Sequence, residues 1–231
     1  MRSGGVVLVA ALCVAAACLS GCGFRHLART VGEGRGELRA SLGGPFLGAL
    51  SGPLLVPSLR AGGRYGVTDG LDVDGSLALD PLAFGVLALD AGLVGQLYRE
   101  PGGFALALSG HAHFLFDLDD DLTTRGFPEL GLHAEHRVDP WLTLFGGVVA
   151  LAQFEPPAGK PPVFVAPYLG AELHLDRTAP TRHSFVIQLA WISPWEDLGP
   201  SWASWEPDGY GALALTLGWR SLHGPSEEAA R

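Results

Sequence analysis

The sequence predicts an all-β protein: an antiparallel up-and-down transmembrane β-barrel of about ten strands, within a range of eight to twelve. Apolar and polar residues alternate with a period of two along most of the chain, and helical spacing is almost absent. Several alternating runs are about ten residues long or more, which suits a tilted crossing of a bilayer. Charged residues make up only 17% of the sequence, a composition that suits a surface facing lipid.

The chain begins with the pattern of a secretory signal peptide. Arg2 provides the positive charge, Val6–Leu19 is an uncharged stretch, and small residues lead to Cys22. The stretch is shorter than the roughly 20 apolar residues that a spanning helix needs. An uncleaved anchor and a signal peptide without lipidation are the alternatives. All cysteines fall within the first 22 residues, so the exported body has neither a disulfide framework nor a cysteine metal site.

The ending Leu19-Ser20-Gly21-Cys22 resembles the lipobox of bacterial lipoproteins. The resemblance implies that residues 1–21 are removed and that Cys22 becomes the first residue of the mature chain, acylated with diacylglycerol and palmitate. We therefore expect a lipidated N-terminal tether over residues 22–34, a β-barrel domain over 35–220 and a polar C-terminal tail over 221–231.

Ten strands are expected, and the clearest pair flanks the turn Thr68-Asp69-Gly70, because an Asp-Gly turn between alternating runs is a strong hairpin signal. A one-residue offset at this turn places Arg64 opposite Asp74, as an inter-strand ion pair. The run 141–154 is apolar on both faces, so its orientation is ambiguous. The expected strands are 35–43, 54–67, 71–80, 85–98, 104–117, 127–138, 141–154, 163–176, 183–193 and 208–220.

The joins after the second, fourth, sixth and eighth strands are compact, and most of the others are longer. Residues 35–220 thus resemble a small bacterial outer-membrane β-barrel, whose short turns face the periplasm, and Arg64–Asp72 is similar to hairpins common in such proteins. The resemblance implies that both termini lie on the short-turn side, with the acyl chains of Cys22 at the periplasmic leaflet. The implied partners are the bilayer and the machineries for lipoprotein export and barrel assembly. An interfacial girdle is expected at that side from Tyr65, Tyr98, Trp141 and Trp219.

One face of the strands collects charged side chains, which we expect in the barrel lumen. Because charges away from bulk water need partners, the expected result is a lumen filled with ion-paired side chains. A narrow solute path or a ligand pocket is the alternative. The residues on this face are Arg60, Arg64, Asp72, Asp74, Asp90, His111, His113, Glu129, His133, Glu135, Arg137, Glu172, His174 and Arg220.

Two kinds of chemistry are conceivable in this set. Hydrolase chemistry would combine Ser109 or Ser184 with a histidine and a carboxylate. A metal could be bound, if their strands adjoin, by His111, His113, His133 and Glu135. Neither pattern contains a known motif, so the sequence predicts no catalytic, cofactor-binding or metal-binding residue, and Cys22 is the one predicted site residue.

Two loops carry further signals. The loop 193–209 contains Trp195, Trp202 and Trp205, and it is expected either to fold over the barrel mouth or to bind carbohydrate or protein. Asp117–Asp121 is expected to be a solvated acidic turn, since it lacks the glycine and glutamate spacing of a calcium loop. The net charge of -9 argues against nucleic acid as a partner.

The resulting hypothesis is an outer-membrane lipoprotein with a structural, adhesive or narrow-pore role and no enzymatic activity. The alternatives are a lipid-anchored periplasmic barrel that binds an apolar ligand internally, and a barrel enzyme that acts on outer-membrane lipid. The direction of the strand leucines discriminates between a membrane barrel and a soluble one, because they point outward in the first and inward in the second. The leucines that decide this are Leu59, Leu77, Leu106 and Leu173.

Overall fold

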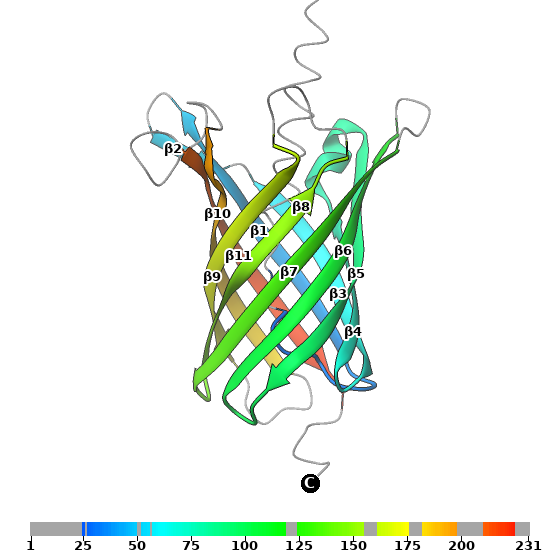
Figure 1. Cartoon of the computed structure of the whole chain (residues 1–231), viewed down its shortest axis with the longest axis vertical. Helices are drawn as coiled ribbons and strands as arrows, with labels where there is room; N and C mark the ends of the chain where they lie inside the picture. Colours follow the sequence, from blue (N-terminus) through cyan, green and yellow to red (C-terminus); the bar gives the residue numbers. More distant parts are fainter. Residues whose placement is uncertain are drawn as a thin grey trace, which may run out of the picture.

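The computed structural model describes residues 25, 27–49, 52–55, 57–118, 124–154, 161–175, 182–197 and 210–224, and they form a β-barrel (Figure 1). Its elements are β1 (Gly36–Ala49), β2 (Gly52–Leu55), β3 (Ser58–Thr68), β4 (Leu71–Ala78), the 3-10 helix η1 (Asp80–Phe84), β5 (Val86–Arg99), β6 (Phe104–Asp117), β7 (Thr124–Asp139), β8 (Leu142–Ala152), β9 (Val163–His174), β10 (Arg182–Asp197) and β11 (Tyr210–His223).

The strands form a closed antiparallel ring. Each strand from β3 to β11 pairs with its sequence neighbour, and β1 pairs with both β3 and β11. Gly36, the first residue of β1, lies between Tyr65 of β3 and His223 of β11. The short β2 pairs only with the far end of β1, so ten strands close the ring. This confirms the predicted all-β barrel and its strand number.

Several strand bounds differ from the sequence-based expectation: β3 begins at Ser58, β7 begins at Thr124, and β10 continues to Asp197, into the first residues of the expected loop 193–209. β1 continues to Ala49 because its far end forms a hairpin with β2, an element that the sequence did not suggest. β11 continues to His223, three residues beyond the expected barrel end, because Ser221 and Leu222 still pair with β1 and β10. Between β4 and β5, the chain forms η1, which ends at Gly85 with φ of 72°.

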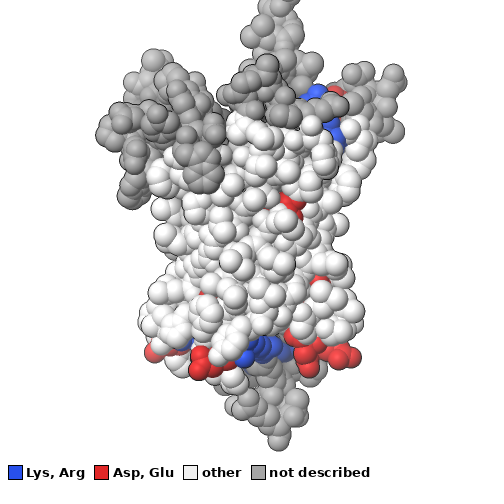
Figure 2. All heavy atoms as spheres, viewed as in Figure 1, with Lys and Arg blue, Asp and Glu red and all other residues white. Residues whose placement is uncertain are grey.

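The exterior of the barrel is apolar. Leu59 is exposed and Leu77, Leu106 and Leu173 are half-buried on the outward face, as expected for a barrel in a bilayer. Figure 2 shows a wall with few charged atoms, while charges gather at its lower end. The predicted girdle residues Tyr65, Tyr98, Trp141 and Trp219 are exposed near this lower, short-turn end, as are Phe104 and Phe185. In the described part of the chain, no helix is both long and apolar enough to span a membrane.

The orientation of β8, ambiguous in the sequence, is settled by its burial pattern. Thr143, Phe145, Val149 and Leu151 are buried and face inward, whereas Leu144 and Val148 are exposed. Phe145 and Val149 belong to an apolar cluster with inward side chains of β9, β10 and β11. The lumen is therefore apolar in part on the β8–β11 side and strongly charged on the β3–β7 side.

Candidate functional site

The lumen is the candidate functional site, because it holds almost all of the charged residues predicted to face inward. Eleven of the fourteen are buried. His174 and Arg220 are half-buried near the short-turn end, and Arg137 is exposed there. The predicted inward face is thus confirmed, and Arg137 marks where it meets solvent.

Ion pairs link the inward side chains across strands. Glu37 of β1 accepts hydrogen bonds from Arg64 of β3 at 2.8 Å and from Arg220 of β11 at 2.6 Å. Arg220 also donates to both carboxylate oxygens of Glu172, at 2.9 and 2.8 Å. A carboxylate that accepts from two guanidiniums offsets much of the desolvation that burial of these charges requires.

The register of the β3–β4 hairpin is as predicted, but the ion partners are different. Arg64 stands directly opposite Asp74. Its guanidinium instead binds Glu37 and lies 3.5 Å from Asp72, while Asp74 accepts from Arg39 of β1 at 2.5 Å. Long arginine side chains reach diagonal neighbours and the next strand, so the residue directly opposite an arginine in the register need not be its ion partner.

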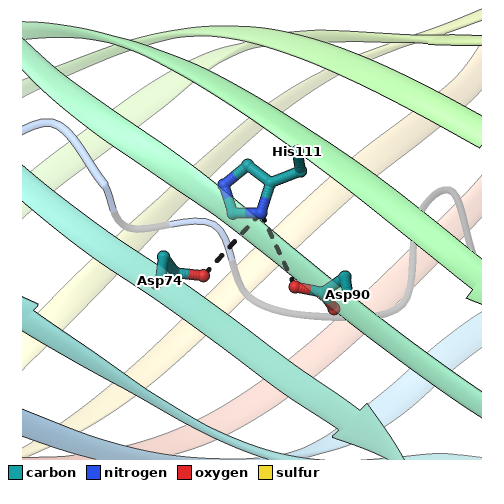
Figure 3. Close-up of side chains that lie close together, drawn as sticks. All are labelled: Asp74, Asp90 and His111. Atoms are coloured by element: carbon teal, nitrogen blue, oxygen red, sulfur yellow. Dashed lines mark ion pairs between the residues drawn. The ribbon is translucent and has the colours of Figure 1, made fainter.

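Asp74, Asp90 and His111 form a compact group on β4, β5 and β6 (Figure 3). Their ligand atoms all lie within 4.8 Å of one another, and theirs is the one such trio of possible metal ligands among the described residues. Two guanidiniums already contact the carboxylates: Arg39 binds Asp74, and Arg60 lies 3.3 Å from Asp90. These fixed cations supply the charge that a metal would bring, so the group is best described as an ion-pair cluster.

The spaced histidines do not combine into the metal arrangement that the sequence left open. Their strands adjoin, but the register places His111 opposite Glu129 and His133 opposite Ala107. His113 instead contacts Glu129 at 3.1 Å.

Ser109, His133 and Tyr168 form a buried hydrogen-bonded row. Ser109 Oγ lies 2.7 Å from His133 Nε2, and His133 Nδ1 lies 2.5 Å from Tyr168 Oη. Tyr168 donates to the backbone carbonyl of Arg25 at 3.0 Å. The first contact has the geometry of a serine–histidine pair. Neither Ser109 nor His133 lines either of the two described cavities.

The other serine considered in the sequence, Ser184, also lies next to a histidine. Ser184 Oγ is 3.1 Å from His174 Nδ1, and His174 Nδ1 is 3.7 Å from Glu172. These three residues line the larger cavity, so the hydrolase alternative stays open.

The N-terminal residues before β1 occupy the lumen. We call residues 25 and 27–35 the lumen segment, and Figure 1 shows it in dark blue inside the barrel. Arg35 lies at the short-turn end, where backbone hydrogen bonds join it and Gly34 to Gly66 of β3. Arg25 lies deeper, and its guanidinium pairs with Glu129. The backbone nitrogen of Arg25 donates to Gln188 Oε1 at 2.7 Å.

Between these ends, the lumen segment is hydrogen-bonded around the barrel wall. Arg29 donates to Glu135 at 2.7 Å and to the carbonyl of Gly103 at 3.1 Å. Gln96 accepts from the backbone nitrogen of Thr30 at 3.0 Å and donates to the carbonyl of Ala28 at 2.8 Å. Val31 donates to Asp72 at 2.9 Å. These partners come from β4, β5 and β7, so the segment is held on several sides.

Gly66 shows how closely the lumen segment approaches the wall. A Cβ built at this position would lie 1.8 Å from the carbonyl oxygen of Gly32 and 2.5 Å from its carbonyl carbon. Only a residue without a side chain permits this approach. Deeper in the barrel, Leu27 packs against Val94 and Ala107, which gives the segment an apolar contact as well.

The position of the lumen segment differs from the expected tether. The sequence-based set of inward residues contains six acidic side chains but only four arginines. Arg25 and Arg29 supply the missing positive charge inside the barrel, through Glu129 and Glu135. That imbalance was the available sequence signal. Cys22 lies outside the described residues, so its acylation stays a prediction.

The two predicted loop features are also largely outside the described residues. Trp202, Trp205 and residues 119–121 lie there, and the side chain of Trp195 is not described. The lid, the contact surface and the acidic turn therefore stay predictions.

Described residues of the lumen line two cavities. The larger, of about 170 Å³, opens at the short-turn end and is lined by Arg29, Arg35 and residues of β5 and β7–β11. The smaller, of about 30 Å³, is lined by Arg25, Leu27 and residues of β1 and β3–β6, among them Asp90 and His111. They share no lining residue. Residues of the lumen segment line both.

No protein-family model and no curated protein matches this sequence. Among solved structures, the fold is similar to a FadL homologue of Pseudomonas aeruginosa, with 10% identity, a TM-score of 0.37, and coverage of 82% of this chain and 63% of that one. It is also similar to the translocator domain of the autotransporter NalP from Neisseria meningitidis, with 10% identity, a TM-score of 0.40, and coverage of 93% of this chain and 95% of that one. A third similar structure is the outer membrane protease OmpT from Escherichia coli, with 9% identity, a TM-score of 0.33, and coverage of 81% of this chain and 93% of that one.

This chain spans less than two thirds of the FadL homologue. At such low identities, the similarity concerns the barrel architecture alone.

Proposed function

We propose that this protein is an outer-membrane barrel whose lumen is closed by its own N-terminal segment, and that its role is structural or adhesive. The observation that carries the proposal is the lumen segment, which is bound to inward side chains on β4, β5, β7, β9 and β10. An outward apolar face and aromatic side chains near the short-turn end support a position in a bilayer.

The contents of the lumen argue against a conducting pore. A barrel of eight strands is just filled by its own side chains, so a ring of ten leaves additional interior space. Here the lumen segment takes up that space: Arg29 binds Glu135 of β7, and Glu37 pairs with arginines of the neighbouring β3 and β11. The outward leucines and charged lumen also make an internal apolar ligand a poor fit.

Conductance across planar bilayers tests the closed lumen. The reconstituted full-length protein is expected to show no stable conductance steps, whereas deletion of residues 27–34 opens a water-filled path and produces them. Deletion of residues 225–231 serves as a control of similar length and leaves the bilayer silent. Stable steps from the full-length protein, equal in size to those of the 27–34 deletion, would contradict the proposal.

Lipidation of Cys22 and anchoring at the periplasmic leaflet are a further part of the proposal. Two residues separate Cys22 from Arg25, and a fully extended chain covers at most about 11 Å between their Cα atoms. Because Arg25 lies deep in the lumen against Glu129 and Gln188, an anchor at the periplasmic leaflet requires the first residues of the lumen segment, as well as residues 22–24, to leave the barrel through its short-turn mouth.

Intact mass of the exported protein tests the lipidation. It is expected to exceed the mass of residues 22–231 by a diacylglyceryl group and one acyl chain, and the Cys22→Ala variant is expected to lack the addition. An exported protein of unmodified mass would refute the lipoprotein prediction.

A further inference from the structure

Four polar side chains from three neighbouring strands meet in the wall of the larger cavity. Ser184 of β10 stands directly opposite His174 of β9, and Thr143 of β8 stands directly opposite Glu172 of β9. His174 and Glu172 are two residues apart on one strand, so they share its inward face. All four residues line the cavity that opens at the short-turn end. The fold thus brings two hydroxyls, an imidazole and a carboxylate together beside open space.

His174 lies between the two hydroxyl groups. Its Nδ1 is 3.1 Å from Ser184 Oγ, and its Nε2 is 2.9 Å from Thr143 Oγ1. A neutral imidazole donates from one ring nitrogen and accepts at the other. When Nε2 donates to Thr143, Nδ1 accepts the hydrogen bond of the Ser184 hydroxyl and is placed to take its proton. This is the arrangement of a serine nucleophile with its general base.

Glu172 lies where it stabilises the charge that such a proton transfer creates. Its Oε1 is 3.7 Å from His174 Nδ1, the nitrogen that receives the proton. Arg220 fixes the Glu172 carboxylate by donating to both of its oxygens. A carboxylate at this distance attracts the positive charge that the imidazole gains on taking a proton.

Access to a cavity distinguishes Ser184 from the other serine–histidine pair of the lumen. Ser109 Oγ is 2.7 Å from His133 Nε2, but neither of these residues lines either cavity. The cavity beside Ser184 has a volume of about 170 Å³, which is room for more than ten waters at about 10–15 Å³ each. The side chain of His174 is 24% exposed. A short acyl group therefore has space next to Ser184.

We propose that Ser184 and His174 form an esterase site, with Ser184 as the nucleophile and His174 as the general base. Its substrate is a carboxylic ester with a short acyl chain that enters from the short-turn side. Thr143 and Glu172 are positioning residues that act through His174. The site goes beyond the structural or adhesive role, because a closed barrel alone needs no accessible nucleophile.

The reaction proceeds through an acyl-serine. Ser184 Oγ attacks the carbonyl carbon of the ester while its proton passes to His174 Nδ1. The bond to the alcohol oxygen then breaks, and that oxygen takes the proton from His174. Water attacks the acyl-serine with His174 again accepting a proton, the bond to Ser184 Oγ breaks, and the proton returns to the serine. In sum, one ester and one water become one acid and one alcohol.

A fluorophosphonate probe, applied to the full-length protein in detergent, tests the nucleophile. Ser184 Oγ attacks the phosphorus, its proton passes to His174 and fluoride leaves, so the probe stays on the serine. Mass spectrometry of the digested protein is expected to find the probe on Ser184, and Ser184→Ala is expected to lose the label. His174→Gln is expected to label at least about 100-fold more slowly, because a general base contributes roughly 10²–10⁴-fold. Ser109→Ala is the matched control and is expected to label as the wild type does.

Hydrolysis of p-nitrophenyl butyrate measures turnover at the same site. The wild type is expected to release p-nitrophenolate, and Ser184→Ala is expected to lose this activity. Thr143→Val removes the hydroxyl that orients His174 while keeping the shape of the side chain, so hydrolysis slows. Thr143→Ser keeps the hydroxyl and restores the rate, which a purely structural role of Thr143 would not produce.

Folding of each variant is verified by its heat-dependent migration in detergent gels. The position of the probe on the wild type needs no variant, so the test holds even where a variant fails to fold. Absence of the probe from Ser184 of the wild type, or equal labelling rates of the wild type and His174→Gln, would overturn the proposal. Neither readout depends on conductance, so the esterase site and the closed lumen can fail separately.

Discussion

At the scale of single residues, the lumen is an arrangement of buried charges that need one another. Glu37, Arg64 and Asp74 are fully or almost fully buried, and each contacts an opposite charge. Removing one member of such a buried pair typically costs about 3–5 kcal/mol, because the other charge stays behind without compensation. The same interactions that close the lumen thus also specify one arrangement of its strands.

Gly66 gives the sharpest prediction at this scale. The variant Gly66→Ala places a methyl group against the backbone of Gly32, which must then move away from β3. We expect a loss of about 1–3 kcal/mol in the free energy of unfolding, the usual range for overpacking. Urea titration of the refolded protein in detergent, followed by tryptophan fluorescence, measures it.

Gly70→Ala is the matched control on the same hairpin. A Cβ at Gly70 meets no atom within 4 Å, so its unfolding free energy is expected to stay close to that of the wild type. Equal stability of Gly66→Ala and Gly70→Ala would show that the lumen segment does not press against β3.

At the scale of elements, the strands and their faces could be predicted from the sequence. A period of two specifies which side chains share a face, and the Asp-Gly turn specifies the register that sets Arg64 opposite Asp74. Ion partners could not be predicted in the same way. They depend on how far long side chains reach across strands, and Arg64 reaches Glu37 on the neighbouring β1.

The position of the lumen segment inside the barrel could not be predicted either, for a different physical reason. It has no regular secondary structure, so no periodicity reveals its environment, and its backbone groups bond to side chains such as Gln96 and Asp72. The β1–β2 hairpin was not predicted for a related reason: the four residues of β2 are too few to show a clear alternation of apolar and polar side chains. Charge balance across the whole lumen was the signal that could have placed Arg25 and Arg29 inside.

At the scale of the whole molecule, the barrel has an apolar exterior, a charged interior and two different mouths. The lumen segment enters at the short-turn end, beside the first residue of β1 and the last of β11. Its residues line both the larger cavity at that end and a small cavity next to Asp90 and His111. We therefore propose that the chain closes its own barrel from within.

Labelling of single introduced cysteines with a polyethylene-glycol maleimide tests this claim most directly. Ala28 is 1% exposed, whereas Glu33 is exposed at the mouth. The wild type gives the background from the natural cysteines, all in the first 22 residues. We predict that Ala28→Cys is protected in the folded protein and reacts only after boiling in SDS, while Glu33→Cys reacts in both states. Equal and rapid labelling of both variants in the folded protein would contradict the account.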